Sequence, residues 1–436
     1  MLPETLSLEQ TPAESDTAPA RQTKGPANTM DKLAIDGGQP VREKPFPRRT
    51  PFGTEEIKQV TEAIESQNLF ALPGNKVKKF EEDFANKYGM EYAIASTSGT
   101  SAIHLAVAAI NPEPGSEIIA APVTDYGTVA GLIYQGCVPV FADWTPCAFN
   151  MDPEQIERNI TDKTAAIIVV HLFGNPCDMD AIMKIGRKHK LPVIEDCCQA
   201  YCTSYKGKWV GTIGDIGCFS MQQSKHLTAG EGGVTITNNA DYAMRMGLFK
   251  DKGWESRGRW GPRAYAFLGL NYRMNELTGA VALAQLQKVE NVVAQRHALG
   301  ELLTDRIKDI EGISPAPVAP GGCHSYWLYP FTITGFPAEL FVKALKAEGI
   351  PATWGYTGKP IYLCTEGLRK KRTFGSSGYP FDSPYYGKKI EYEEGLCPVA
   401  EEELSRMGTL DLNEDWTAAD AEDAAAAIKK VAENLK

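Results

Sequence analysis

Lys225 and Asp196 are the residues of this chain whose types and positions most clearly suggest chemistry. Asp196 ends the apolar run LPVIED, where a carboxylate is expected only if something positive faces it. A pyridinium nitrogen is such a partner, because a buried carboxylate keeps that nitrogen protonated. Lys225 follows the apolar run IGCFSM, and its amine could hold a carbonyl compound as a Schiff base. Both interpretations have plain alternatives, since a loop lysine is commonly solvated and a strand-end aspartate can cap the next helix. Glu195 is the weaker candidate for the role of Asp196.

A phosphate group could bind where the segment STSGTSAIHLAV, residues 96–107, turns from a strand into a helix. The backbone N–H groups and the dipole at such a helix start attract anions, and Gly99 would make the turn. Thr100 and Ser101 can add hydroxyl donors, and Ser220, at the end of a later apolar run, could reach the same group. The alternative is that the Ser and Thr residues here are ordinary helix N-caps.

Short apolar runs alternate with helical patterns through the central part of the chain. This alternation indicates βαβ units and an α/β fold with a mainly parallel, doubly wound sheet. Ligands of such sheets bind at the carboxyl ends of the strands, where Asp196, Gly99 and Ser220 would meet. The runs cover residues 92–96, 117–123, 138–144, 165–173, 191–196, 216–221 and 232–237.

The chain divides into three predicted parts. Residues 1–29 are rich in Pro, Thr, Ala and Glu and poor in apolar residues, so we expect a disordered tail. Residues 30–300 form a large cofactor-binding domain with a leading segment, and residues 301–436 form a smaller α+β domain. The stretch 370–389 is rich in Gly, Pro and aromatic residues and long for an unstructured connection, which suggests a functional loop.

Two helical patterns flank the apolar runs. Ile57, Val60 and Ile64 are spaced for an amphipathic helix that begins near Phe52 and leads into the large domain. The apolar spacing across residues 283–293 predicts one long helix that leads toward the small domain.

The composition excludes several classes of function. A net charge of −10 and a pI near 5.3 give no basic surface for nucleic acid. No apolar stretch approaches the roughly 20 residues of a membrane span, and we find no export signal. The ten cysteines are scattered, so we expect reduced thiols and a cytoplasmic protein. Cys197, Cys198 and Cys202 lack the spacing of metal ligands, and no metal site is expected.

Six separated motifs, taken in order, resemble the DegT/DnrJ/EryC1/StrS aminotransferases. They are SGTSA, P-x-x-x-Tyr, VHLFGNPCDMD, EDCCQA, FS-x-x-x-x-K-x-x-x-x-GEGG and GLNYRMNEL, within about residues 50–330. The resemblance implies the fold-type I (aspartate aminotransferase-like) architecture, a pyridoxal 5′-phosphate (PLP) cofactor and a homodimer. It also implies amination of keto groups on sugars or cyclitols.

The resemblance implies a role for each matching position. Lys225 would be the Schiff-base lysine, and Asp196 the partner of the pyridine nitrogen. Gln199 falls where the family places a residue near the ring hydroxyl of the cofactor. Thr100 and Ser220 match the phosphate contacts.

Other matching positions concern the substrate and the second subunit. Asn271 matches an asparagine that reaches the phosphate of the neighbouring subunit, which predicts active sites shared across a dimer. His324 and Tyr326 resemble residues on the acceptor side, although they could equally be ordinary strand residues. Where the family commonly has Thr-Phe, this chain has Asp125-Tyr126. Tyr126 could stack on the cofactor ring, unless it belongs to the core, and Asp125 could bias the choice of substrate.

These inferences predict a ping-pong transaminase that moves an amino group from glutamate or glutamine to a keto-sugar or keto-cyclitol. Lys225 would anchor the cofactor and also carry the proton. Two alternatives share the fold: a PLP-dependent sugar dehydratase, in which a histidine replaces the lysine, and a non-catalytic regulator. At that place this chain has Lys225 followed by His226. The chain has no G-x-G-x-x-G segment after a strand and no P-loop motif, so the sequence does not indicate a nucleotide cofactor.

Overall fold

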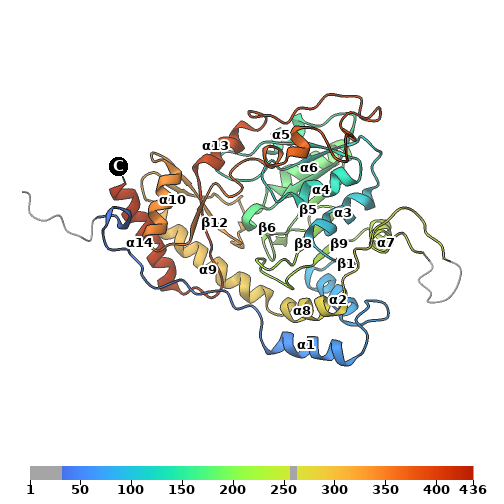
Figure 1. Ribbon diagram of the computed structural model, residues 1–436, viewed down its shortest axis with the longest axis horizontal. Coiled ribbons are helices and arrows are strands. Elements are labelled where there is room, and N and C mark those ends of the chain that lie inside the picture. Colours follow the sequence, from blue (N-terminus) through green and yellow to red (C-terminus); the bar gives the residue numbers. More distant parts are fainter. Residues whose placement is uncertain (1–31, 256–262, 436) are drawn as a thin grey trace, which may run out of the picture.

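A seven-stranded sheet forms the centre of the larger part of the molecule (Figure 1). The computed structural model describes residues 32–255 and 263–435, so the predicted tail at residues 1–29 lies outside it. The strand order is β1-β9-β8-β5-β4-β2-β3. The bounds are β1 (Tyr92–Ser96), β2 (Glu117–Ala120), β3 (Val138–Phe141), β4 (Thr164–Val170), β5 (Val193–Asp196), β8 (Ile216–Ser220) and β9 (Gly233–Thr237).

The sheet is mainly parallel, as predicted, and each of the seven apolar runs supplies one strand. Strands β3, β2, β4, β5 and β8 pair in parallel, whereas β9 runs antiparallel to both β8 and β1. Strand β1 therefore points the same way as the parallel strands, and their carboxyl ends share one edge. The runs lack polar alternation because helices cover both faces of such a sheet.

Two clusters of buried side chains join the sheet to its helices. The larger one packs the parallel strands against α3 (Gly99–Ile110), α4 (Gly127–Tyr134) and α6 (Met179–His189). The other packs β1, β8 and β9 against α2 (Lys76–Tyr88) and α8 (Glu276–Leu286). Helix α3 is buried along nearly its whole length, which holds the start of this helix firmly against the sheet edge.

Helix α1 (Thr54–Glu65) packs against α8 through the side that carries Glu56 and Ala63. Glu56 is buried and accepts hydrogen bonds from Gln285 Nε2 at 2.9 Å and Lys288 Nζ at 2.9 Å. Ile57 and Ile64, on the predicted apolar side, are 67% and 53% exposed.

The predicted long helix is instead two helices. Helix α8 ends at Leu286, and α9 (Val289–Ile307) begins after Gln287 and Lys288. The N–H groups of these two residues bond to the carbonyls three residues earlier, which tightens the turn and ends α8.

A four-stranded antiparallel sheet, in the order β10-β12-β14-β13, forms the smaller part at the left of Figure 1. Its strands are β10 (Ile313–Pro315), β12 (Tyr329–Ile333), β13 (Ala352–Trp354) and β14 (Met407–Leu410). Helices α9, α10 (Ala338–Ala347) and α14 (Ala418–Asn434) pack on it. The remaining elements are η1 (Ala34–Asp36), α5 (Pro153–Arg158), η2 (Leu172–Gly174), β6 (Ser204–Tyr205), β7 (Lys208–Trp209), α7 (Ala240–Phe249), β11 (Gly322–Cys323), α11 (Ile361–Cys364), α12 (Glu366–Arg369) and α13 (Pro398–Arg406).

Two segments pack across the predicted division at residue 300. Leu33 belongs to the core of the smaller part, while side chains between Ile361 and Met407 join the core of the larger part. The stretch 370–389 lies against the larger part, where Tyr386 OH donates to Glu117 Oε1 at 3.2 Å. The division itself stays a prediction. None of the helices in residues 32–255 and 263–435 is long and apolar enough to cross a membrane.

Candidate active site

A cavity of about 320 Å³ opens at the carboxyl edge of the central sheet. Segments that follow β1, β2, β4, β5 and β8 line it, together with two aromatic residues from the smaller part, Trp327 and Tyr356. The structure brings seven of the predicted site residues to this cavity. They are Gly99, Thr100, Asp125, Asp196, Gln199, Ser220 and Lys225.

Asp196 is the last residue of β5 and faces the cavity with 3% of its surface exposed. Its Oδ2 accepts a hydrogen bond from Thr128 Oγ1 at 2.7 Å, and its Oδ1 accepts one from the Cys198 N–H at 3.0 Å. Thr124 Oγ1 lies 2.7 Å from Thr128 Oγ1 and extends the chain. A carboxylate has about four acceptor positions, so this one retains capacity for a further donor from the cavity.

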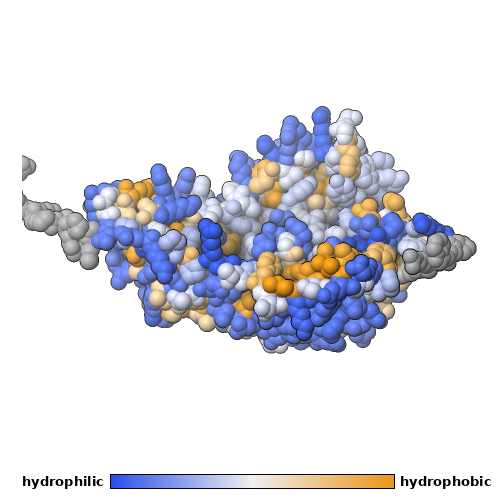
Figure 2. All heavy atoms as spheres, turned by 60° about the horizontal axis from the view of Figure 1, so that its bottom comes forward, coloured by the Kyte–Doolittle hydropathy of each residue, from blue (hydrophilic) through white to orange (hydrophobic). Residues whose placement is uncertain are grey.

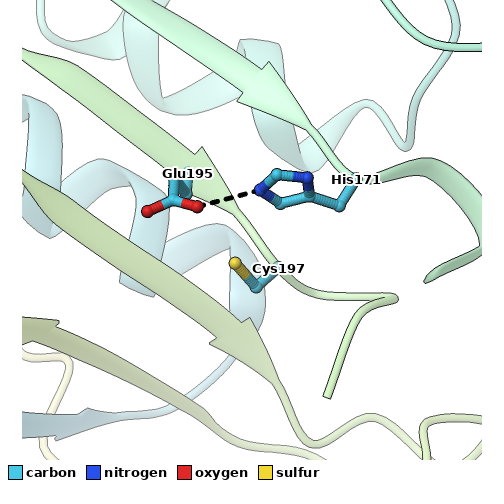
Figure 3. Close-up of side chains that lie close together, drawn as sticks. All are labelled: His171, Glu195 and Cys197. Atoms are coloured by element: carbon cyan, nitrogen blue, oxygen red, sulfur yellow. Dashed lines mark hydrogen bonds and ion pairs between the residues drawn. The ribbon is translucent and has the colours of Figure 1, made fainter. Parts of the chain in front are cut away.

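Glu195 belongs to a separate cluster with His171 and Cys197 (Figure 3). Because successive side chains of a strand alternate, it points away from the face that Asp196 uses. Its two oxygens accept four hydrogen bonds, from His171 Nε2 at 3.0 Å and from backbone N–H groups within residues 211–214 at 2.5–2.8 Å. His171 Nδ1 accepts from the Cys177 N–H at 3.1 Å, so both ring nitrogens are occupied. These bonds account for the positions of Glu195 and His171 in the cluster.

Lys225 enters the cavity from the loop after β8 and is 9% exposed. Within the described part of the chain its amine makes no hydrogen bond or ion pair, and Nζ lies 3.7 Å from the centre of the Trp327 ring. Burial lowers the pKa of this amine, and the nearby Cys198, Asp196 and Asp125 oppose the shift only in part. A desolvated amine of lowered pKa is a nucleophile and a proton acceptor.

The start of α3 closes another side of the cavity. Ser98 caps the helix: its Oγ accepts from the Ser101 N–H at 3.1 Å, and Ser101 Oγ accepts from the Ser98 N–H at 2.8 Å. A Cβ atom at Gly99 would lie 2.6 Å from Ser220 Cβ, so only glycine allows this close approach of α3 to the end of β8. The free N–H groups of the first turn and the hydroxyls of Thr100 and Ser220 suit an anion.

Five predicted residues lie outside the cavity lining. Ser101 is engaged in the helix cap, and Tyr126 begins α4 with 39% of its surface exposed. Tyr326 stacks on His324 with the ring centres 3.9 Å apart, and both are buried within the smaller part. Asn271 is exposed, and its predicted contact with a second subunit stays a prediction.

The sequence interpretation missed several residues that line the cavity, and four of them bear on its chemistry. Thr128, Glu231, Trp327 and Tyr356 all face it. Tyr356 OH accepts from Gln199 Nε2 at 3.1 Å, and Gln199 Oε1 in turn accepts from the Phe173 N–H at 2.8 Å. Glu231 stands in the GEGG motif and could have been found there.

A buried ion-pair network supports the loop of Lys225 from behind. Glu414 pairs with Arg49 at 2.6 Å and with Arg296 at 2.7 Å. Arg49 Nη2 also donates to the His226 carbonyl at 2.8 Å, and Arg296 Nη1 donates to the Trp327 carbonyl at 3.1 Å. Through these bonds the carboxylate of Glu414, in the smaller part, is linked to the loop of Lys225 and to Trp327.

A lysine and an aspartate that face one cavity at this edge of a mainly parallel sheet fit the active site of an aminotransferase. The model of the DegT/DnrJ/EryC1/StrS aminotransferase family matches residues 51–429, and the chain belongs to this family.

Named relatives extend over most of the chain. GDP-perosamine synthase from Caulobacter vibrioides is 38% identical over 282 residues, which are 64% of this chain and 75% of that protein. L-glutamine:2-deoxy-scyllo-inosose aminotransferase from Streptoalloteichus tenebrarius is 30% identical over 426 residues, 92% of this chain and 97% of that protein. The X-ray structure of the aminotransferase from Psychrobacter cryohalolentis superposes with a TM-score of 0.78 at 29% identity, covering 90% of this chain and all of the other.

Proposed function

We propose that the protein is a PLP-dependent transaminase that moves an amino group from glutamate or glutamine to the keto group of a sugar or cyclitol. The observation that carries this proposal is the shared cavity of Lys225 and Asp196. The names of the relatives support it, since one aminates a cyclitol with L-glutamine and another is a perosamine synthase.

The residues of the cavity fit the proposed cofactor. Asp196 retains acceptor capacity for a protonated ring nitrogen, and the start of α3 with Gly99 and Ser220 offers a cradle for a phosphate. Gln199 would meet the ring hydroxyl, and the unpaired amine of Lys225 would form the covalent attachment.

When bound, PLP supplies an electron sink for breaking a bond to the α-carbon of the amino donor. Asp196 holds a proton at the ring nitrogen, and the hydroxyl of Thr128 keeps this carboxylate in place. Once displaced by the donor, Lys225 Nζ is free to take the α-proton and return it at the C4′ carbon. The same steps in reverse, with a keto acceptor in place of the keto acid, complete a ping-pong cycle.

The structure gives no support to the dehydratase alternative. His226 follows Lys225, but its Nε2 donates to the Ser325 carbonyl at 3.0 Å, and its side chain is outside the cavity lining.

The ten free cysteines accord with the proposed cytoplasmic location.

A homodimer belongs to the proposal, and an apolar surface supports it. Figure 2, which brings the α1 side of the molecule forward, shows apolar side chains gathered on this face. Large apolar residues of α1 and its flanking segments are between 38% and 67% exposed, and a contiguous apolar patch of this kind marks an interaction site. They are Phe52, Ile57, Ile64, Leu69, Phe70 and Leu72. Mixing Asn271→Ala with Lys225→Ala protein should restore part of the activity if the sites are shared, whereas no rescue would show self-contained sites.

Borohydride reduction tests the proposed function directly. Purified protein with PLP should show a visible absorption band that borohydride abolishes, and mass spectrometry should find the reduced adduct on Lys225. The Lys225→Ala variant should show neither, whereas Lys430→Ala should behave as wild type. Lys430 is a matched control because its side chain is also largely buried, at 13% exposure, but it pairs with Glu348 in the smaller part. An unmodified Lys225 would refute the proposal.

A further inference from the structure

Trp327 is held rigidly against the amine of Lys225. It lies between β11 and β12, and its ring centre is 3.7 Å from Nζ. The indole Nε1–H donates to the Ser224 carbonyl at 2.9 Å, and the backbone N–H donates to the Phe173 carbonyl at 2.7 Å. These two bonds, one from the side chain and one from the backbone, hold the ring beside the amine.

The proposed cycle asks this amine to alternate between two charge states. Nζ would take the proton from the α-carbon of the donor and pass the same proton to C4′, while bound PLP would supply the sink for the C–H electron pair. Burial disfavours the protonated amine, so something must stabilise it briefly without keeping its proton. The face of an indole attracts an ammonium group but, unlike a carboxylate, cannot accept the proton.

The other charged or titratable groups near the amine are less suited to this task. In the proposed function the remaining acceptor capacity of Asp196 serves the ring nitrogen of the cofactor, and Asp125 accepts from the Gly127 N–H at 2.7 Å. His226, behind the lysine, is buried and bonded to a carbonyl. The remaining groups of the cavity wall are Cys198, Glu231 and Tyr356.

We infer that Trp327 is a positioning residue for Lys225: its indole face holds and stabilises the amine while it carries the transferred proton. This inference rests on the proposed function. It predicts that the ring acts on proton transfer and leaves cofactor attachment and donor binding unchanged.

Three variants separate this role from a structural one. Trp327→Leu removes the ring, and Trp327→Phe retains a weaker aromatic face but loses the bond to Ser224. Trp354→Leu is the matched control, because its Nε1–H also donates to a backbone carbonyl, Ser405, at 2.9 Å, and it lies outside the cavity lining. Circular dichroism and the borohydride adduct on Lys225 show that each variant folds and loads PLP.

Two measurements test the inference. In cofactor-free protein, the pH dependence of acetylation of Lys225, read by mass spectrometry, reports the pKa of the amine. The ring stabilises the protonated form, so Trp327→Leu should shift the labelling midpoint down by about 0.4 to 1.5 pH units. In the holoenzyme, kcat should fall by about 2- to 30-fold with an unchanged KM for the donor, and an α-deuterated donor should show a larger isotope effect. Trp327→Phe should lie between wild type and Trp327→Leu.

The possible results distinguish a failure of the inference about Trp327 from a failure of the proposed function. An unchanged labelling midpoint in Trp327→Leu, or an equal change in Trp354→Leu, would overturn the inference and leave the proposed function intact. A rise in KM without a fall in kcat would also overturn it. Absence of the borohydride adduct in wild-type protein would instead refute the proposed function itself.

Discussion

Replacing Glu414 by glutamine should destabilise the protein more than any change to a surface ion pair. The side chain of Glu414 is 8% exposed, and its partners Arg49 and Arg296 are 13% and 3% exposed. Glutamine keeps the shape and one acceptor oxygen but removes the charge between two buried guanidinium groups. Breaking a buried pair in this way costs about 3–5 kcal/mol, and we expect about 3 kcal/mol because the amide still accepts a hydrogen bond.

The effect should depend on pH in a defined direction. Burial raises the pKa of Glu414, but the charges of Arg296 and Arg49 outweigh it and bring the pKa below its usual value. A carboxyl whose pKa is lowered by folding adds stability above its unfolded pKa, which is about 4.3, and loses it as the pH falls through the folded pKa. The difference between wild type and Glu414→Gln should therefore be full at pH 7 and shrink below about pH 4.5.

Urea denaturation followed by tryptophan fluorescence measures the loss, with Glu422→Gln as the matched control. Glu422 pairs with Arg306, but these side chains are 44% and 45% exposed, so its loss should cost less than about 1 kcal/mol. Equal losses for the two variants at pH 7 would refute the argument. So would a gap that widens as the pH falls.

Three further substitutions test the cavity itself. Gly99→Ala should weaken PLP retention at least about tenfold in equilibrium dialysis, because the added Cβ would lie 2.6 Å from Ser220 Cβ and force the cradle apart. Thr128→Val removes a donor to the carboxylate of Asp196, and since hydrogen bonds to charged groups contribute about 1.5–3 kcal/mol, kcat should fall at least about tenfold with the fold intact. Tyr356→Phe should leave the shape of the pH–rate profile unchanged below pH 10, because burial raises the pKa of Tyr356 to about 12 and its phenol is protonated throughout. Loss of an ionisation from that profile in the variant would contradict this assignment.

The central sheet could be predicted from the sequence because its strands are buried on both faces. Such strands appear as short continuous apolar runs, and helical segments between them leave few other arrangements. Once the strands are placed, topology brings their carboxyl ends together. Asp196 at the end of β5 and Ser220 at the end of β8 therefore reach the same cavity, as does Gly99 after β1. The meeting of these three residues in the candidate site therefore follows from the placement of the strands along the chain.

The parts that the sequence did not reveal depend on contacts between distant segments. Trp327 lies in a stretch whose aromatic residues have similar local patterns, and only packing decides that Trp327 faces the cavity while Tyr326 turns into the smaller part. The end of α8 could not be predicted either, because the apolar spacing of the sequence continues past Leu286, where the helix ends. The orientation of α1 also could not be predicted, since the buried partner of α8 is the carboxylate of Glu56.

Glu195 and Asp196 show how a strand separates two chemically identical groups into different tasks. Both are buried and adjacent in sequence, so residue type and position along the chain do not distinguish them. The alternation of the strand sends them to opposite faces, where Glu195 meets four donors and Asp196 meets two. A carboxylate with every acceptor position used can only hold the fold, whereas one with positions left over can receive a proton donor from a ligand. The unused acceptor capacity of Asp196, more than its burial, supports its proposed role at the cofactor.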